Sequence, residues 1–429
     1  SGCHTLITET VDLSGNLTGD HFVEQATYHE WLNSSFNDEA FPLTGISCQG
    51  CHIPRIEDSV VISNNYLFLT GRSPYGLHQL AGGNVFMLTM LRDHRTALGL
   101  TANETQFDST IARTMRNLQQ HSVLLDLDVA WRDADTAWID VRLTNLTGHK
   151  FPSGYPSRRA WVELVVVDNS GDTLFKSGRW NSAYEVEGHD ANWEPHYDMI
   201  NDPGQAQIYE MVMSDVNGNK TTVLERAKEP LKDNRLAPLG FSTSHFTYDT
   251  TLIAGVPASD IDFNRDDLGV EGSGSDVVHY HVPMSGYTDL IHVFARVWYQ
   301  SAPPLWNEEM FAYNSAEIDS FRTMYEAADN SPILVQSDSL DDLSVGIDHV
   351  DELGVQVFPN PVHDGWLNVL GLSKRVQEVE VFDVHGRLVD HTAVDGRRFW
   401  RVRMPEGAAT YLVVFRSMGQ IFVRRVVVQ

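Results

Sequence analysis

The stretch "SCQGCHIP" at residues 47–54 constrains this chain more than any other feature, because it contains a complete C-x-x-C-H motif. In such a motif the two thiols add to the vinyl groups of a haem, and the adjacent histidine becomes an axial ligand of the iron. The two intervening residues let both sulfurs reach one edge of the porphyrin. Cys48, Cys51 and His52 therefore predict a covalently attached haem c and a fold arranged around it.

Two other readings of this motif are weaker. A redox-active disulfide would open a helix in a βαβ setting, and a zinc site would need another pair of ligands. The sequence has three cysteines, and the remaining one, Cys3, is itself followed by His4. We expect these two residues to be the end of a second haem-attachment motif, so that the sequence is the downstream part of a longer chain. The prediction is at least two haems c, with His4 and His52 as proximal iron ligands.

Iron in an electron-carrying haem c usually has a second axial ligand, His or Met. The sequence contains 18 histidines, and three of them have settings that favour this role. His78 precedes a Gly-Gly pair in "SPYGLHQLAGGN", and His149 lies in a turn rich in Gly, Pro and Thr, "LTNLTGHKFPSGYP". His196, in "NWEPHYDMI", has aromatic neighbours that suit either a haem edge or core packing. The sequence leaves the choice among them open.

The chain is strongly acidic. Its formal charge of −27 opposes binding to nucleic acid and to anionic lipid head groups, and it favours a basic partner or a cationic acceptor. Apolar residues make up 42% of the chain and charged residues 21%, which is typical of a folded globular protein. No apolar run approaches the roughly 20 residues that span a bilayer. We therefore expect neither a nucleic-acid partner nor a membrane span.

The apolar pattern divides the chain into four parts. Residues 1–123 mix short helical patterns with loops and form the predicted haem-binding segment. Residues 124–327 alternate apolar and polar residues between turn signals, which predicts a β-sandwich that contributes haem ligands. Residues 328–353 are acidic and Ser-rich and predict a linker, and residues 354–429 predict a small Ig-like β-sandwich. The predicted fold class is α+β and mostly β.

One loop of the predicted sandwich has many carboxylates. The stretch "FNRDDLGVEGSGSD" at residues 263–276 makes calcium a further candidate cofactor. Its order of residues does not match an EF-hand loop, so a solvated loop is the favoured reading.

Two family resemblances accompany these motifs. The tail, with "FPNPV", "VEVFDVHGRLV" and "YLVVF", resembles the C-terminal sorting domain of the type IX secretion system, which implies export to the cell surface or the medium. The rest, with "SCQGCHIP", "TGHKFPSGYPSRRAWVEL", "WEPHYDMI" and "LKDNRLAPLGF", resembles bacterial multihaem c-type cytochromes. That resemblance implies largely bis-histidine haems and favours His78, His149 and His196. Members of this family usually carry more C-x-x-C-H motifs than are present here.

These observations support two functions of different classes. The first is an extracellular multihaem cytochrome without enzymatic activity, which passes electrons between haems and on to a redox partner or an external acceptor. Assembly of copies into a conducting filament is compatible with it. The alternative is a multihaem oxidoreductase that acts on a small nitrogen or sulfur compound at a five-coordinate haem, with charge supplied by Arg158 and Arg159.

Overall fold

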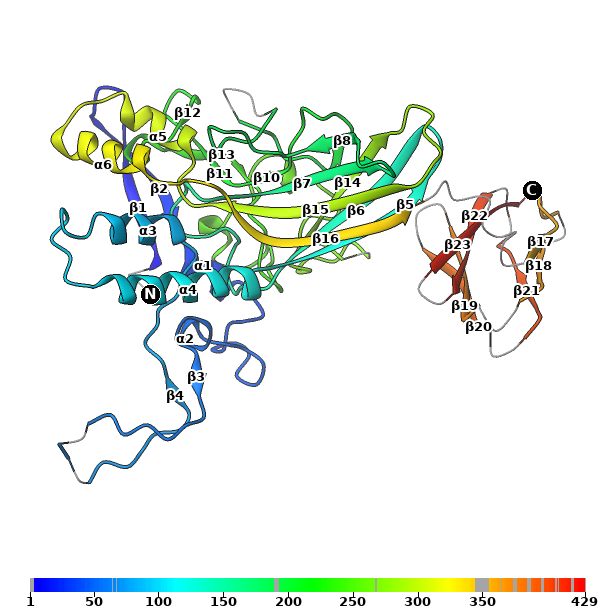
Figure 1. Ribbon diagram of the computed structural model, residues 1–429, viewed down its shortest axis with the longest axis horizontal. Coiled ribbons are helices and arrows are strands. Elements are labelled where there is room, and N and C mark those ends of the chain that lie inside the picture. Colours follow the sequence, from blue (N-terminus) through cyan, green and yellow to red (C-terminus); the bar gives the residue numbers. More distant parts are fainter. Residues whose placement is uncertain are drawn as a thin grey trace. The chain divides into compact units, whose positions relative to one another are not determined.

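The computed structural model describes residues 4–428 except 64, 67, 189–192, 267, 344–354, 364, 373–375, 384–386, 395–396, 406, 408 and 418–419. The chain divides into two compact units. The first contains Ser1–Ala130, Trp138–Pro283 and His292–Asp341, and the second contains Trp131–Ala137, Met284–Ile291 and Asp342–Gln429. Figure 1 shows the order of the elements along the chain.

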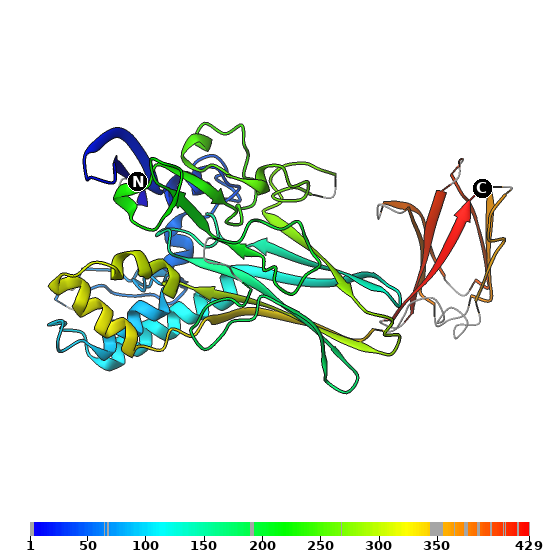
Figure 2. The same ribbon diagram turned by 90° about the horizontal axis from the view of Figure 1, so that it is seen from above.

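Two sheets form the centre of the first unit. One has the strand order β5-β6-β14-β9, and the other has the order β10-β7-β15-β16, with β8 paired to β7. The strands of the first sheet are β5 (Val123–Arg132), β6 (Thr136–Asn145), β14 (Ser275–Pro283) and β9 (Met199–Ile200). Those of the second are β10 (Ile208–Tyr209), β7 (Arg159–Asp168), β15 (Ile291–Gln300), β16 (Ile333–Leu343) and β8 (Thr173–Ser177). Figures 1 and 2 show the long strands of both sheets running alongside one another.

The period-two apolar pattern explains these strands. In β6 and β15 every second residue is buried, because successive side chains of a strand point to opposite faces. The buried faces supply the apolar core, which includes Val141, Leu164, Val278 and Val293, each fully inaccessible to solvent. The alternation therefore predicted the strands correctly over most of this region.

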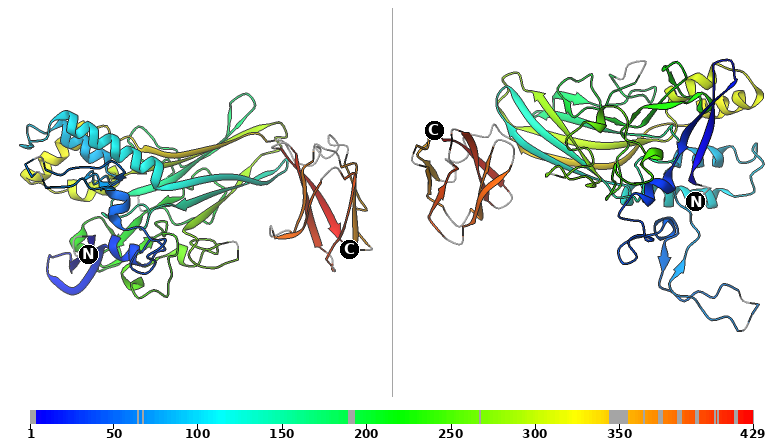
Figure 3. Two further views of the ribbon diagram at one scale, coloured as in Figure 1. Left: turned by 90° about the horizontal axis from the view of Figure 1, so that it is seen from below. Right: turned by 180° about the vertical axis from the view of Figure 1, so that it is seen from behind.

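Smaller elements surround the two sheets. A third sheet is formed by β12 (Lys220–Thr221), β11 (Met211–Ser214) and β13 (Glu229–Asp233). Two hairpins are formed by β1 (Leu6–Val11) with β2 (Leu17–Gln25), and by β3 (Arg55–Ile56) with β4 (Tyr75–Gly76). Figures 1 and 3 show the segment between β3 and β4 extending away from the sheets as an arm.

The helices are mostly short. They are α1 (Thr27–Leu32), α2 (Cys48–His52), α3 (Val85–Asp93), α4 (Glu104–His121), α5 (Pro304–Phe311) and α6 (Ala316–Ala327), with 3-10 turns at Leu224–Arg226, Tyr248–Thr250 and Val256–Ala258. The predicted helical pattern before residue 124 is α4, which begins with a capping box of Asn103 and Gln106. Among the described residues, no helix is both long and apolar enough to cross a membrane.

The predicted linker at residues 328–353 is structured in its first part. Ile333–Leu343 form strand β16, which lies at the end of the five-stranded sheet beside β15. An edge strand leaves many of its side chains in solvent, so acidic and serine residues are tolerated there and the apolar alternation is weak. Residues 344–354, the rest of the predicted linker, lie outside the described residues.

Residues 355–428 form the predicted C-terminal sandwich. One antiparallel sheet has the order β17-β18-β21, and the other has the order β20-β19-β22-β23. The strands are β17 (Gln356–Phe358), β18 (Trp366–Leu370), β19 (Glu378–Asp383), β20 (Leu388–Ala393), β21 (Phe399–Arg403), β22 (Ala409–Ser417) and β23 (Gln420–Val428). Buried residues of both sheets, among them Leu367, Val369, Val381 and Val413, share one apolar core. The predicted fold class, α+β and mostly β, is confirmed.

Candidate functional site

The C-x-x-C-H motif forms a short helix of its own. Cys48, Cys51 and His52 all lie on α2, and both thiols are free and exposed. Partial burial nevertheless raises the pKa of both thiols above the ordinary value. A redox-active C-x-x-C needs a lowered thiol pKa, so this environment disfavours the thioredoxin-like reading. The exposed sulfurs remain accessible to a large cofactor.

The ring of His52 lies near that of His149, a residue much later in the chain. The rings of His52 and His149 are nearly parallel, with an interplanar angle of 15° and centroids 6.3 Å apart. The Nδ1 atom of His52 lies 2.6 Å from the carbonyl oxygen of Ala81, and that of His149 lies 2.8 Å from the carbonyl oxygen of Lys150. Because a carbonyl can only accept, both Nδ1 atoms carry the proton and donate. The Nε2 atom of each ring is therefore the nitrogen with a free lone pair.

This spacing fits a metal held between the two rings. A metal–imidazole bond is about 2 Å long, and two such bonds plus the distance from each nitrogen to its ring centre give a centroid separation of about 6 Å. The hydrogen bonds at Nδ1 would orient both rings, as partners of metal-bound histidines generally do. The donor set of two thiols and two imidazoles therefore fits a haem c with two axial histidines.

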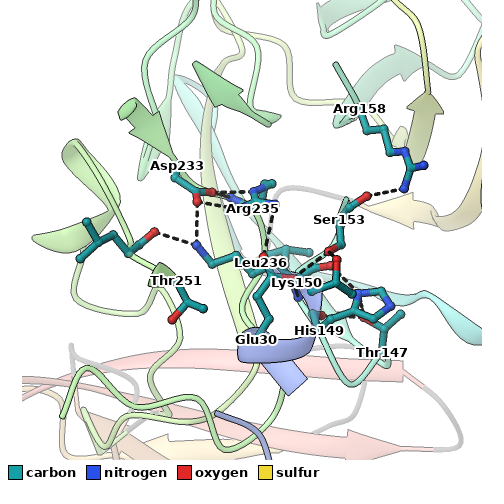
Figure 4. A network of polar contacts seen from close by, with 12 residues as sticks. Glu30, Thr147, His149, Lys150, Ser153, Arg158, Asp233, Arg235, Leu236 and Thr251 are labelled. Atoms are coloured by element: carbon teal, nitrogen blue, oxygen red, sulfur yellow. Dashed lines mark hydrogen bonds and ion pairs between the residues drawn. The ribbon is translucent and has the colours of Figure 1, made fainter. Parts of the chain in front are cut away.

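The loop that carries His149 is held by hydrogen bonds from Asn145, at the end of β6; Figure 4 labels Thr147, His149 and Leu236 of this region. The Asn145 side chain donates from Nδ2 to the carbonyl oxygens of His149 at 2.8 Å and Leu236 at 2.9 Å, and its Oδ1 accepts from the Thr147 backbone N–H. Burial also lowers the pKa of His149, which keeps the imidazole in the neutral form that binds metals. The loop thus presents a neutral, oriented ring.

Gly148 lets this loop approach α1. A Cβ atom at position 148 would lie 3.1 Å from Cδ1 of Trp31 and 3.1 Å from Cβ of Phe36, which is tighter than most real contacts. Trp31 in turn donates from Nε1 to the carbonyl oxygen of Ile46, just before α2. The glycine of "TGHK" therefore allows the loop of His149 to pack close to the segment that carries the motif.

His78 lies in the segment that pairs with the chain just after α2, and among the described residues its ring contact is with Tyr75. It follows β4, which pairs with β3, and the neighbouring Leu77 donates its backbone N–H to Pro54 at 2.9 Å. The His78 side chain is exposed, and its ring contacts Tyr75 with centroids 6.2 Å apart. His78 remains a predicted haem ligand.

His196 lies in a buried polar network that uses both of its ring nitrogens. Its Nδ1 lies 2.8 Å from Nε2 of Gln207 and 3.1 Å from Nδ2 of Asn234. The oxygens of both amides accept backbone N–H groups, so the amide nitrogens must donate to Nδ1. Nε2 then carries the proton and donates to Asp260 at 2.8 Å. In this arrangement His196 offers no lone pair to iron, in contrast to His149.

Cys3, the remaining predicted attachment point, lies outside the described residues, and His4 is exposed at the start of the described chain. The second haem therefore stays a prediction from the sequence.

The carboxylates expected to attract calcium mostly serve the protein itself. Asp266 accepts the backbone N–H groups of Leu268 and Val270, and Glu271 accepts from Thr243. Two nearby clusters combine histidine with aspartate, namely His196–Asp260–Asp276 and Asp198–Asp262–His279. Both ring nitrogens of each histidine are already hydrogen-bonded, so neither histidine has a free nitrogen for a metal. Calcium stays a prediction.

His279 should make stability depend on pH in the alkaline range. Hydrogen bonds to Asp140 at 2.6 Å and Asp262 at 3.0 Å raise its pKa to about 10 from an ordinary value of 6.5. The folded state then holds a proton that the unfolded state releases, so this stabilisation is present below pH 6.5 and is lost as the pH rises to about 10. We expect His279→Gln to destabilise the protein at pH 6 and to have less effect at pH 10, as measured by urea unfolding. An equal effect at both values would contradict the ion-pair explanation.

Replacement of Asp276 should have the opposite effect and stabilise the folded protein at neutral pH. Burial raises the pKa of Asp276 to about 6 from 3.8, while its Oδ2 accepts from Tyr209 and its Oδ1 finds no hydrogen-bond partner among the described residues. Ionisation therefore disfavours the folded state, and wild-type stability falls between about pH 4 and pH 6. Asp276→Asn should remove this loss and raise the free energy of unfolding at pH 7 by about 3 kcal/mol relative to wild type, with little change at pH 4. A free energy of unfolding that differs from wild type by the same amount at pH 4 and at pH 7 would contradict this explanation.

Comparisons with known proteins assign no family. No protein-family model matches the sequence, and no curated protein matches it. Among solved structures, a penta-heme cytochrome c552 from Thermochromatium tepidum matches with 17% identity and a TM-score of 0.39, over 79% of this chain and 54% of that chain. HBP35 of Porphyromonas gingivalis matches with 11% identity and a TM-score of 0.18, over 77% of this chain and 72% of that chain. The chain thus spans about half of that cytochrome (54%), and these scores are too low to assign a fold or a function.

Proposed function

We propose that this chain is a c-type cytochrome that transfers electrons. The observation that carries the proposal is the pairing of His52 and His149, with ring centroids 6.3 Å apart, next to two exposed motif thiols. Hydrogen bonds from both Nδ1 atoms to backbone carbonyls leave the Nε2 atoms for axial ligation. We infer that Cys48 and Cys51 attach the haem, that His52 is the proximal ligand and that His149 is the distal ligand.

The residues of this chain have distinct tasks in that role. A bound haem would supply a one-electron couple. Two thioethers would hold the cofactor permanently, and two histidines would occupy both axial positions and exclude a third ligand. The carbonyl oxygens of Ala81 and Lys150 would keep both rings in a fixed orientation during electron transfer, so that little reorganisation is needed.

The surroundings of the predicted ligands favour a carrier over the oxidoreductase. Arg159, one of the two arginines considered for catalysis, is buried and donates to Glu185 at 2.7 Å and to Gln300 at 2.8 Å. Arg158 interacts electrostatically with His149 and donates to the backbone carbonyl oxygen of Ser153. This position suits an ion pair with a haem propionate. Two axial histidines leave no open position for a small substrate.

The wider role belongs to the same proposal. Cys3 and His4 would hold a further haem, and the resemblance of residues 354–429 to a sorting domain supports export to the cell surface or the medium. The net charge of −27 favours a basic redox partner or a cationic external acceptor. Electron exchange with such an acceptor, by single copies or by a filament of them, is the physiological function that we propose.

The test is the visible spectrum of the purified protein, oxidised and dithionite-reduced, with and without carbon monoxide, together with a count of covalent haems by mass spectrometry. Sharp low-spin bands that carbon monoxide does not alter are expected of a carrier. A high-spin band or a carbon monoxide shift would instead indicate an open iron and favour the oxidoreductase. Replacing both Cys48 and Cys51 by alanine is the control and should lower the haem count by one.

A further inference from the structure

Four charged residues are buried in and next to the loop of His149 (Figure 4). Lys150 is fully buried and donates from Nζ to Oδ2 of Asp233 at 2.8 Å and to the carbonyl oxygen of Leu252 at 2.7 Å. Arg235 donates to both carboxylate oxygens of Asp233, at 2.8 and 2.7 Å. The Oε1 atom of Glu30, on α1, lies 3.4 Å from Nη1 of Arg235. We call Glu30, Lys150, Asp233 and Arg235 the buried quartet.

The charges of the buried quartet balance. It contains two acids and two bases, so its net formal charge is zero. Although burial opposes ionisation, Arg235 and Lys150 hold the pKa of Asp233 below its ordinary value. Any single neutral substitution in the quartet therefore leaves one buried charge in excess, in surroundings that water screens poorly.

Glu30 connects the quartet to the imidazole of His149. Its Oε2 atom accepts from the Lys150 backbone N–H at 3.1 Å and from the Ser153 hydroxyl at 2.7 Å. The carbonyl oxygen of the same Lys150 accepts from Nδ1 of His149 at 2.8 Å. The Glu30 carboxylate also interacts electrostatically with the His149 ring. The Glu30 side chain is only 1% exposed, so solvent weakens this influence little.

We propose that Glu30 is the positioning residue of His149, and that its buried negative charge lowers the reduction potential of the haem bound there. The inference rests on the proposed function and deepens it. Oxidation of the iron adds one positive charge, which a nearby anion stabilises. Burial and nearby hydrogen bonds are levers by which a protein tunes a haem potential.

The experiment is a redox titration of the holoprotein with two glutamate variants. Glu30→Gln keeps an oxygen for the Lys150 N–H and the Ser153 hydroxyl but removes the charge. We expect the ratio of reduced to oxidised haem at a fixed applied potential to rise about tenfold, which corresponds to an upward shift of about 59 mV for a one-electron couple. The haem should stay low-spin, because the hydrogen bonds that position the loop are kept.

Glu185→Gln is the matched control. Glu185 also accepts from an arginine, Arg159 at 2.7 Å, and from a backbone N–H, that of Leu305 at 2.8 Å. These contacts lie on β7 and α5 rather than on the loop of His149. The control should leave the potential unchanged, whereas a shift equal to that of Glu30→Gln would overturn the inference.

Arg235→Gln tests the same inference with the opposite charge, and it applies even where Glu30→Gln fails to accumulate. It leaves the quartet with an excess negative charge, so the potential should fall. A shift in the same direction as that of Glu30→Gln would indicate general disruption and overturn the electrostatic role of Glu30. A wild-type protein without covalent haem would overturn the proposed function itself, which separates that failure from this one.

Discussion

Replacing His149 by alanine is expected to convert the haem attached at Cys48 and Cys51 to a five-coordinate form that binds carbon monoxide. His149 is the histidine whose ring centroid lies 6.3 Å from that of His52, and its Nε2 is the ring nitrogen left without the proton. Alanine removes the ligand but leaves the loop backbone, which Asn145 holds through the carbonyl oxygens of residues 149 and 236. The measurement is the low-spin fraction of the oxidised spectrum and the carbon monoxide difference spectrum of the reduced protein.

Two comparisons make this result specific. Added imidazole should enter the space left by the His149 side chain and restore the low-spin spectrum, which a general loss of structure would not allow. His78→Ala should leave the haem at Cys48 and Cys51 low-spin, because His78 contacts Tyr75 rather than His52. If His78→Ala removes the low-spin bands of this haem and His149→Ala does not, the assignment of the distal ligand is wrong.

The largest expected effect on stability is that of Lys150→Met. Lys150 is 0% exposed and its Nζ lies 2.8 Å from Asp233, whose side chain is 4% exposed. Methionine has a similar length but no charge, so the quartet keeps two acids with only Arg235 to compensate them. Breaking a buried ion pair by removing one partner lowers the free energy of unfolding by about 3 to 5 kcal/mol. Urea unfolding followed by circular dichroism measures this loss.

Lys228→Met is the control for this prediction. Lys228 lies 3.6 Å from Asp20, and the two side chains are 39% and 48% exposed. An exposed ion pair contributes only about 0 to 1 kcal/mol, because water and salt screen it. Similar losses for the two methionine variants would show that burial of the quartet does not determine its contribution.

Much of the fold could be predicted from short stretches of sequence. The period-two alternation identified the long strands, and the pattern of residues 354–429 predicted a sandwich whose sheets share one core. The strand at residues 333–343 was missed, since an edge strand with acidic and serine residues has the composition of a linker. Its identity depends on pairing with β15, which the local sequence does not record.

The sequence by itself predicts the chemistry of haem attachment. In C-x-x-C-H, five consecutive residues carry both thiols and one imidazole, so the chemistry follows from local geometry and is readable without a fold. The tertiary structure decided which of three histidines lies beside His52, because that depends on segments far apart in the chain. His149 and His196 have comparable local settings, yet one ring keeps a free Nε2 while the other is enclosed by Gln207, Asn234 and Asp260. Glu30 had no sequence signal at all, since its role arises only where α1 meets the loop of His149 and the strand end at Asp233.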